Sequence, residues 1–239
     1  MKKSFDFGQE EYKSDIAWRK IENVFRGIFE REYYTETGPL VQALESRIRE
    51  ATGFKDVICI GSAWVAHLML LDALDVQRLR IAGDLTNYLQ SALPWFTSIH
   101  VVNEDSSSNC TAPTTSEFDS SIAQVDATEV QWAVTSLATP ELSWFVSGSR
   151  FRSIKRVLDT SKMPLQASAG ADIHICALNR EQRFRDLDGA YLATNDLDLA
   201  DRLRTMRSSS GVSRLLPVKK TVNGRMSEAQ AGIALLSLA

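Results

Sequence analysis

The sequence has few of the features that mark secreted, membrane or nucleic-acid-binding proteins. Its three cysteines, Cys59, Cys110 and Cys176, are odd in number and widely spaced, which favours reduced thiols over disulfides and matches no metal-ligand spacing. No run approaches the roughly 20 apolar residues that cross a bilayer, and the start, MKKSFDFGQEEY, lacks the apolar core of a signal peptide. A net charge of −3 gives no basic footprint for nucleic acid or an anionic membrane. We therefore expect a cytoplasmic protein that binds neither nucleic acid nor membrane.

The overall composition is typical of a globular protein, with 44% apolar and 24% charged residues among 239. Its most informative stretch runs from Gly38 to Leu74. After a helical pattern, the continuous apolar run Val57–Ile60 predicts a strand that is buried on both faces. The small residues Gly61, Ser62 and Ala63 then lead into a second apolar helix. Such a turn leaves backbone N–H groups at the positive end of a helix dipole, so it is a candidate anion site, and a purely structural turn is the alternative.

Strand and helix patterns alternate along the rest of the chain. A helix is expected over Asp15–Glu30, with Ser14 as its N-cap. Further strands are expected at residues 79–82, 99–102, 130–134, 156–159 and 171–178, a strand with its turn at 189–196, and further helices at 86–93 and 197–206. Residues 104–117 are rich in Ser and Thr, include Asn109 and Pro113 and have no large apolar residue, which predicts a solvated loop.

The stretch from Gly38 to Leu74 resembles the DegT/DnrJ/StrS family of nucleotide-sugar aminotransferases, which have the type I fold and use pyridoxal 5′-phosphate (PLP). The matching positions are Gly38, Pro39, Glu45, Gly53 and His67-Leu68. With the alternation of strands and helices, the resemblance implies a three-layer α/β sandwich with a mostly parallel sheet and a site at the carboxyl ends of the strands. We expect residues 1–239 to form one large domain, with residues 1–30 as an N-terminal helical arm and the family's small C-terminal domain missing.

The resemblance also implies which residues would hold the cofactor. Ser62 and Ala63 stand in the family's Ser-Gly-Thr phosphate cup, where Ala63 lacks the threonine hydroxyl. Asp159 matches the aspartate that holds the protonated pyridine nitrogen, which makes the cofactor an electron sink, and a helix cap is the alternative. Cys176 lies on the strand that aligns with the family's Ser-Phe-His strand and is a further candidate for cofactor binding. Tyr88 stands one place beyond the family's ring-covering aromatic residue.

The position of the Schiff-base lysine is occupied by Glu181. Counting forward from Asp172 and back from Asp188-Gly189 leads to it, and the loop NREQRFRDLDG contains arginines but no lysine. An arginine stays protonated and does not form the Schiff base. Lys162, where the family has a glutamine near the aldehyde carbon, is a candidate relocated amine if burial lowers its pKa; a solvent-exposed lysine is the alternative. His174 lies too early on its strand to act here, and we expect a buried, hydrogen-bonded histidine.

The segment 222–236 resembles the one in which an asparagine crosses the dimer interface to the partner's cofactor phosphate. Asn223, Arg225 and Met226 stand in that pattern. The alternative is that Ser227 caps a helix and that Asn223 and Arg225 are merely exposed. The resemblance thus implies a homodimer, or a heterodimer with an aminotransferase paralogue.

Three hypotheses about function follow. The first is a non-catalytic aminotransferase-like protein that dimerises and regulates or stabilises its partner. The second is an enzyme that uses PLP, or its amine form PMP, non-covalently and weakly on a nucleotide-linked sugar, as a transaminase or dehydratase. The third is an ordinary aminotransferase whose lysine lies at another position. Binding of no cofactor at all is as compatible with the sequence as weak, non-covalent binding of PLP or PMP.

Overall fold

The computed structural model describes residues 18–35, 37–82, 87–96, 99–104, 129–134, 154–159, 171–178, 188–208 and 215–238. The helices are α1 (Trp18–Arg31), α2 (Pro39–Thr52), α3 (Ala63–Ala73), α4 (Asn87–Ala92), the 3-10 turn η1 (Leu93–Trp95), α5 (Leu197–Arg207) and α6 (Glu228–Leu238). The strands are β1 (Asp56–Ile60), β2 (Arg78–Ala82), β3 (His100–Glu104), β4 (Glu129–Val134), β5 (Ile154–Asp159), β6 (Ile173–Ala177) and β7 (Ala190–Thr194). Their order confirms the expected alternation. Ser14, and the expected loop beyond Glu104, lie outside the described residues.

The strands form one seven-stranded sheet in the order β1-β7-β6-β5-β4-β2-β3. Neighbouring strands from β6 to β3 pair in parallel, whereas β7 is antiparallel to both β1 and β6. The sheet is therefore mostly parallel, as the sequence predicts. Because β7 alone is reversed, its amino end lies at the same edge of the sheet as the carboxyl ends of β1 and β5.

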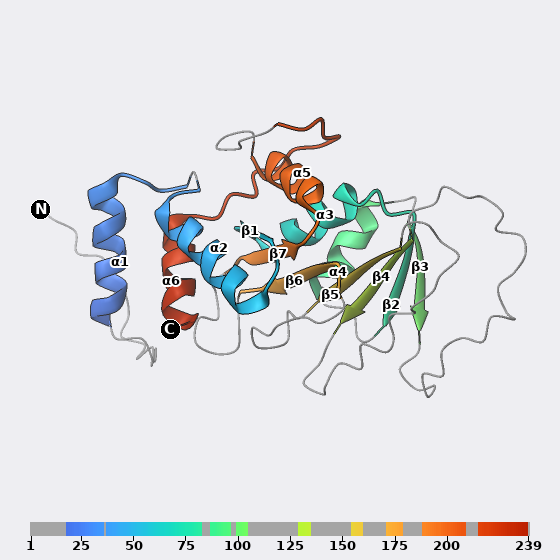
Figure 1. Ribbon diagram of the computed structural model, residues 1–239, viewed down its shortest axis with the longest axis horizontal. Coiled ribbons are helices and arrows are strands. Elements are labelled where there is room, and N and C mark those ends of the chain that lie inside the picture. The colour runs from blue at the N-terminus through green and yellow to red at the C-terminus, as the bar shows by residue number, and fades with distance from the viewer. Residues whose placement is uncertain are drawn as a thin grey trace, which may run out of the picture.

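Helices cover both faces of this sheet and complete three layers (Figure 1). Ile58 and Ile60 of β1 face a cluster with α3, α4 and α5, and the alternate residues Val57 and Cys59 face α2 and α6. This alternation follows from the two-residue period of a strand, and it requires apolar residues on both sides. Helix α1 lies at one end, beside α6, and β3 lies at the other (Figure 1).

Local sequence signals explain where the helices begin and end. Helix α2 starts at Pro39, whose fixed φ suits a first helical position, and it ends at Gly53 in the left-handed conformation, with φ of 76°. The buried carboxylate of Glu228 accepts hydrogen bonds from the N–H groups of Leu40 and Val41, at 2.9 and 3.0 Å. A negative group at the positive end of α2 stabilises that end and fixes α6 against it.

In the part of the chain that the structure describes, no helix is long and apolar enough to span a bilayer.

Candidate cofactor site at the strand carboxyl ends

Asp159, the last residue of β5, lies fully buried on the sheet face that α3 covers. Its Oδ2 accepts hydrogen bonds from His67 Nε2 at 3.0 Å and from the indole N–H of Trp132 at 3.4 Å. The other ring nitrogen of His67, Nδ1, lies 2.7 Å from the carbonyl oxygen of Ala63. A carbonyl oxygen only accepts, so Nδ1 carries a proton.

Aromatic rings enclose this pair. The ring of His67 stacks on Trp132 of β4, with centroids 5.6 Å apart, and on Tyr88 of α4, with centroids 5.7 Å apart. Tyr88 therefore covers a histidine of its own chain. Neither Trp132 nor the contact of His67 with Asp159 was predicted: a tryptophan within a buried strand is typical of an ordinary core residue, and His67 was matched by position only.

The turn 61–63 closes tightly against a distant part of the chain. The N–H of Gly61 donates to the carbonyl oxygen of Gly224 at 2.9 Å, and Ile60 pairs with Arg225 as an isolated antiparallel bridge. A Cβ atom at Gly61 would lie 2.5 Å from the carbonyl oxygen of Arg225. Only glycine allows so close an approach of two backbones. Ser62 precedes α3 in an extended conformation and makes no side-chain cap.

Asp188 supplies the acceptor at the start of α3. Its Oδ1 accepts the N–H of Ala63 at 2.9 Å and that of Gly189 at 2.8 Å. The amide Nε2 of Gln230 donates to the carbonyl oxygens of Gly61 and Asp188, at 2.9 and 2.8 Å. In the sequence, Asp188 served only as a reference position for locating Glu181. Its place beside a glycine at the start of a strand is the local sequence feature that marks it.

The predicted interface residues lie close to this turn. Asn223 is exposed, and its Oδ1 accepts from Arg225 Nε at 3.2 Å, while Met226 between the turn and α6 is buried. Ser227 Oγ accepts the N–H of Gln230 at 3.2 Å and so caps α6. The capping part of the alternative interpretation is thus present in the structure. Contact of Asn223 with a partner subunit stays a prediction.

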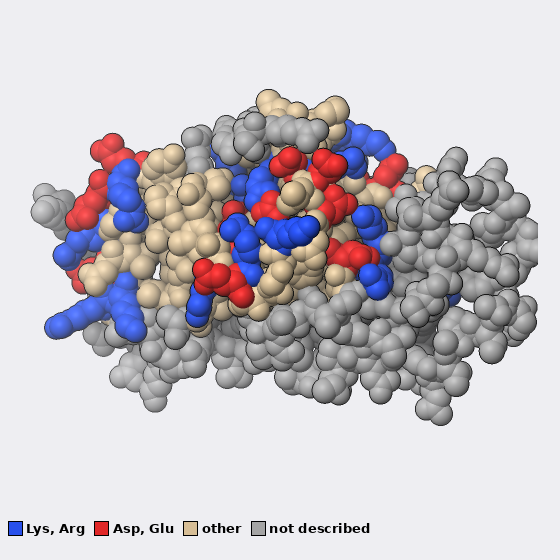
Figure 2. Space-filling view, in the orientation of Figure 1, with Lys and Arg blue, Asp and Glu red and all other residues tan. Residues whose placement is uncertain are grey.

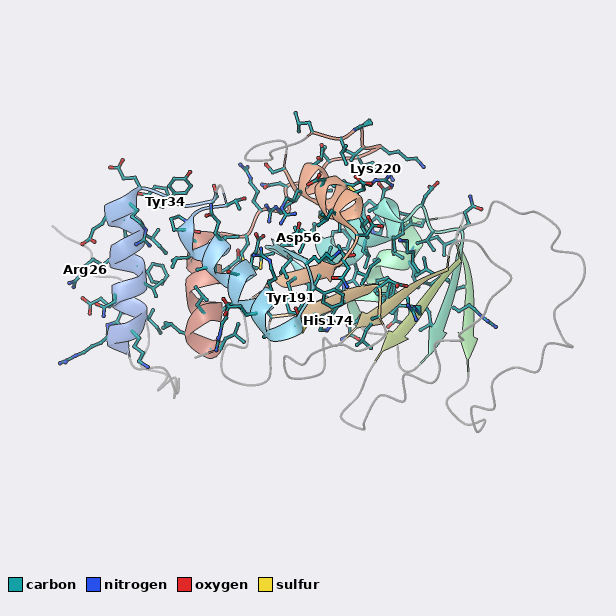
Figure 3. All side chains as sticks on the ribbon, in the orientation of Figure 1. Arg26, Tyr34, Asp56, His174, Tyr191 and Lys220 are labelled. Carbon is teal, nitrogen blue, oxygen red and sulfur yellow. The ribbon has the colours of Figure 1, made fainter. Side chains whose placement is uncertain are left out.

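The structure does not bring every candidate to this site. Cys176 lies on the opposite face of the sheet from Asp159, in the cluster under α2 and α6, because Ile175 pairs with Asp159 and successive side chains alternate. Its Sγ donates to the carbonyl oxygen of Ala177. His174 is buried on that same far face, where its ring meets Tyr191 at 5.3 Å (Figure 3). Glu181 and Lys162 lie outside the described residues, which also hold no cluster of His, Cys, Asp or Glu suited to a metal.

Comparisons with solved structures show the fold. A GDP-4-keto-6-deoxymannose-3-dehydratase with a trapped PLP-glutamate geminal diamine has a TM-score of 0.72 and 14% identity, over 95% of this chain and 67% of that chain. The aminotransferase TlmJ from Streptoalloteichus hindustanus has a TM-score of 0.70 and 18% identity, over 92% and 63%. DesI in the presence of its TDP-sugar product has a TM-score of 0.67 and 18% identity, over 94% and 59%. No protein-family model and no curated protein sequence matches the chain.

This chain therefore has the fold of the PLP-dependent sugar aminotransferases and dehydratases. At these identities the likeness shows the fold alone. The chain spans 59% to 67% of the length of the three solved structures.

The described residues do not fit PLP as they stand, either at its ring nitrogen or at its phosphate. Asp159 is in place at the strand end for a ring nitrogen, but its carboxylate is fully buried and already accepts from His67 and Trp132. At the phosphate end, Ala63 offers no hydroxyl and its N–H already donates to Asp188. A phosphate at this N–H would meet a carboxylate of the same sign.

Proposed function

We propose that this protein is a non-catalytic, aminotransferase-like protein that acts as a dimer partner or regulator of a second copy of itself or of an aminotransferase paralogue. The observation that carries the proposal is Glu181 at the position where the resemblance places the Schiff-base lysine. A carboxylate cannot form an imine with an aldehyde, and the arginines of this loop stay protonated.

The geometry at the start of α3 supports a non-catalytic role. The hydroxyl that would bind a phosphate is absent at Ala63, and Asp188 takes its N–H. Transamination needs a cofactor that is held with its reacting carbon correctly placed. Of the groups that would hold the phosphate, the hydroxyl is absent and the N–H of Ala63 is already engaged. This support is independent of Glu181.

Two exposed features support the dimer. Helix α1 carries an uncovered apolar stripe of Trp18, Phe25 and Phe29, and the segment with Asn223 and Arg225 lies just before α6, on which α1 packs. Apolar stripes of this kind, rimmed by charged residues, are typical of interfaces between subunits.

A reduction experiment tests the loss of the Schiff base. The purified protein is mixed with PLP and treated with borohydride, and its intact mass is measured, with an active aminotransferase treated in parallel. We expect no lysine labelled at stoichiometric yield, because no amine occupies the reactive position. One fully labelled lysine in the resting protein would refute the proposal.

A second candidate is an enzyme that holds PLP or PMP non-covalently and acts on a nucleotide-linked sugar. Asp159 favours it by its position, since a carboxylate at the end of β5 is the group that a protonated ring nitrogen needs, but His67 and Trp132 already donate to this carboxylate. Lys162 is the candidate relocated amine, and it tests both candidates. If Lys162→Ala abolishes an absorbance band of a cofactor–lysine Schiff base and Glu181→Ala keeps it, the expected absence of a lysine Schiff base is wrong, and so is non-covalent binding. If Lys162→Ala leaves PLP affinity unchanged, the relocation is excluded.

A further inference from the structure

We infer that Asp188 is a built-in anion for the start of α3, so that the turn which would bind a phosphate is occupied by a carboxylate of the chain itself. Its Oδ1 accepts the N–H of Ala63, the first residue of an eleven-residue helix, at 2.9 Å. The positive end of a helix dipole favours any negative group placed there, whether phosphate or carboxylate. The inference does not depend on Glu181.

The reversed direction of β7 places Asp188 at this turn. Ile60, the last residue of β1, pairs with Ala190, the first residue of β7, so the residues just before β7 lie beside the turn that follows β1. Gly189 has a φ of 144°, a conformation that L side chains rarely adopt. It turns the chain so that the Asp188 carboxylate also accepts the N–H of Gly189, at 2.8 Å.

Other groups hold this arrangement from the opposite side. Gln230 donates from one amide nitrogen to the carbonyl oxygens of Gly61 and Asp188, so it joins the two segments that flank the turn. The N–H of Gly61 is engaged by Gly224 at 2.9 Å. Two N–H groups of the turn, those of Gly61 and Ala63, therefore already have acceptors from the protein.

A phosphate group could bind at Ala63 only by displacing the Asp188 carboxylate. If both stayed, two groups of like charge would lie within contact distance of one N–H, and this repulsion is not relieved by a second donor at Gly61. Asp188 is thus a specificity-determining residue that keeps phosphate monoesters from the first N–H group of α3.

Thermal unfolding with inorganic phosphate as the probe tests this inference. Melting temperatures are compared in phosphate and in chloride at equal ionic strength, for the wild type, Asp188→Ala and Asp188→Asn. We expect no phosphate-specific shift for the wild type. Asp188→Ala should melt lower in chloride and regain several degrees in phosphate. Asp188→Asn keeps an acceptor without the charge, should fold like the wild type, and should also gain from phosphate.

Asp196→Asn is the matched control, because Asp196 caps α5 by accepting the N–H of Leu199 at 3.1 Å and leaves the turn at Ala63 unchanged. Its phosphate response should equal that of the wild type. Saturable stabilisation of the wild type by phosphate, or no phosphate response in either Asp188 variant, would overturn the inference. The result is separable from the borohydride test, since a labelled lysine would contradict the proposed function while a phosphate response in the Asp188 variants, with none in the wild type, still upheld the role of Asp188.

Discussion

Two charged side chains in the interior of this protein, Arg207 and Glu45, neutralise each other. Arg207 of α5 donates from Nη1 to Glu45 Oε1 at 2.9 Å and to the carbonyl oxygen of Cys59 at 2.8 Å. The N–H of Cys59 donates to the same Glu45 oxygen at 2.9 Å. The side chains of Arg207 and Glu45 are only 3% and 8% exposed, so this ion pair joins α2, β1 and α5 without burying net charge.

Glu45→Ala should destabilise the protein strongly, because it leaves the guanidinium of Arg207 buried without its counter-ion. Breaking one side of a buried pair costs about 3 to 5 kcal/mol. Urea unfolding measures this cost. Lys219→Ala is the control, since Lys219 pairs with Asp75 at the surface, where ion pairs contribute little. Equal midpoints for the two variants would show that the buried pair is not important for stability.

Asp56 makes the stability depend on pH. Burial opposes ionisation of its carboxyl and is the largest effect, but the hydrogen bonds and charge of Arg204, at 2.5 and 2.6 Å, and the N–H of Val57 outweigh it and lower the pKa of Asp56. A carboxyl with a lowered folded-state pKa contributes stability above its unfolded pKa of about 3.9, and that contribution is lost as the pH falls through the folded value.

The destabilisation by Asp56→Asn should therefore be full at neutral pH and should shrink as the pH falls below about 4. Urea unfolding of wild type and variant at a series of pH values gives this difference directly. Glu22→Gln, in an exposed pair with Arg26 on α1, should change the free energy of unfolding little at neutral pH. A difference for Asp56→Asn that stays constant down to strongly acidic pH would contradict the assignment.

Part of the candidate site follows from the sequence alone. The position of Asp159 at the sheet edge is predictable, because it ends an apolar strand pattern and parallel strands end at one edge. Its contact with Trp132 is not predictable, since it requires that β4 and β5 be neighbours in register. The role of Asp188 was missed because it depends on the direction of β7, and the apolar pattern of a strand is the same in either direction.

At the scale of the elements, α1 packs closely against α6 at Gly232. A Cβ atom at Gly232 would come within 2.3 Å of Val24 in α1 and 3.2 Å of Leu40 in α2. Of the α1 side chains, Ile28 is buried. The helical periodicity of α1 predicted the helix. Its packing site could not be predicted, because Gly232 lies about two hundred residues away and nothing in its local sequence marks it as a helix contact.

Gly232→Ala should loosen α1 from α6, because the added methyl group cannot fit without moving Val24. Overpacking of this kind costs about 1 to 3 kcal/mol. Hydrogen exchange should become faster in α1 and stay unchanged in β1 and β7. Gly27→Ala is the control, since its Cβ would meet only the flexible guanidinium of Arg31 at 3.1 Å. Faster exchange in both variants would mean that helix α1 is weakly formed and not specifically docked.

At the scale of the whole molecule, α1 presents uncovered apolar surface at one end of the protein. Trp18, Phe25 and Phe29 lie at i, i+7 and i+11, which aligns them along one side of the helix, and Trp18 is 72% exposed. Charged residues gather on α1 and over α5, and other residues lie between these two groups (Figure 2). The exposed Asn223 belongs to the segment that leads into α6, the helix on which α1 packs.

We expect the protein to form a dimer through this end, either a homodimer with twice the chain mass of 26.6 kDa or a heterodimer with a co-expressed aminotransferase paralogue. Replacing Trp18 and Phe29 by serine should weaken it, since each buried aromatic anchor contributes about 2 kcal/mol, roughly 30-fold in Kd. Light scattering after size-exclusion chromatography across a dilution series measures the change. Trp95→Ser, which removes an exposed tryptophan from η1, the turn next to α4, should leave the dimer intact. A monomer at every concentration, both alone and with the paralogue, would exclude both this interface and the role of dimer partner. The stripe of three exposed aromatic residues would then serve some other contact.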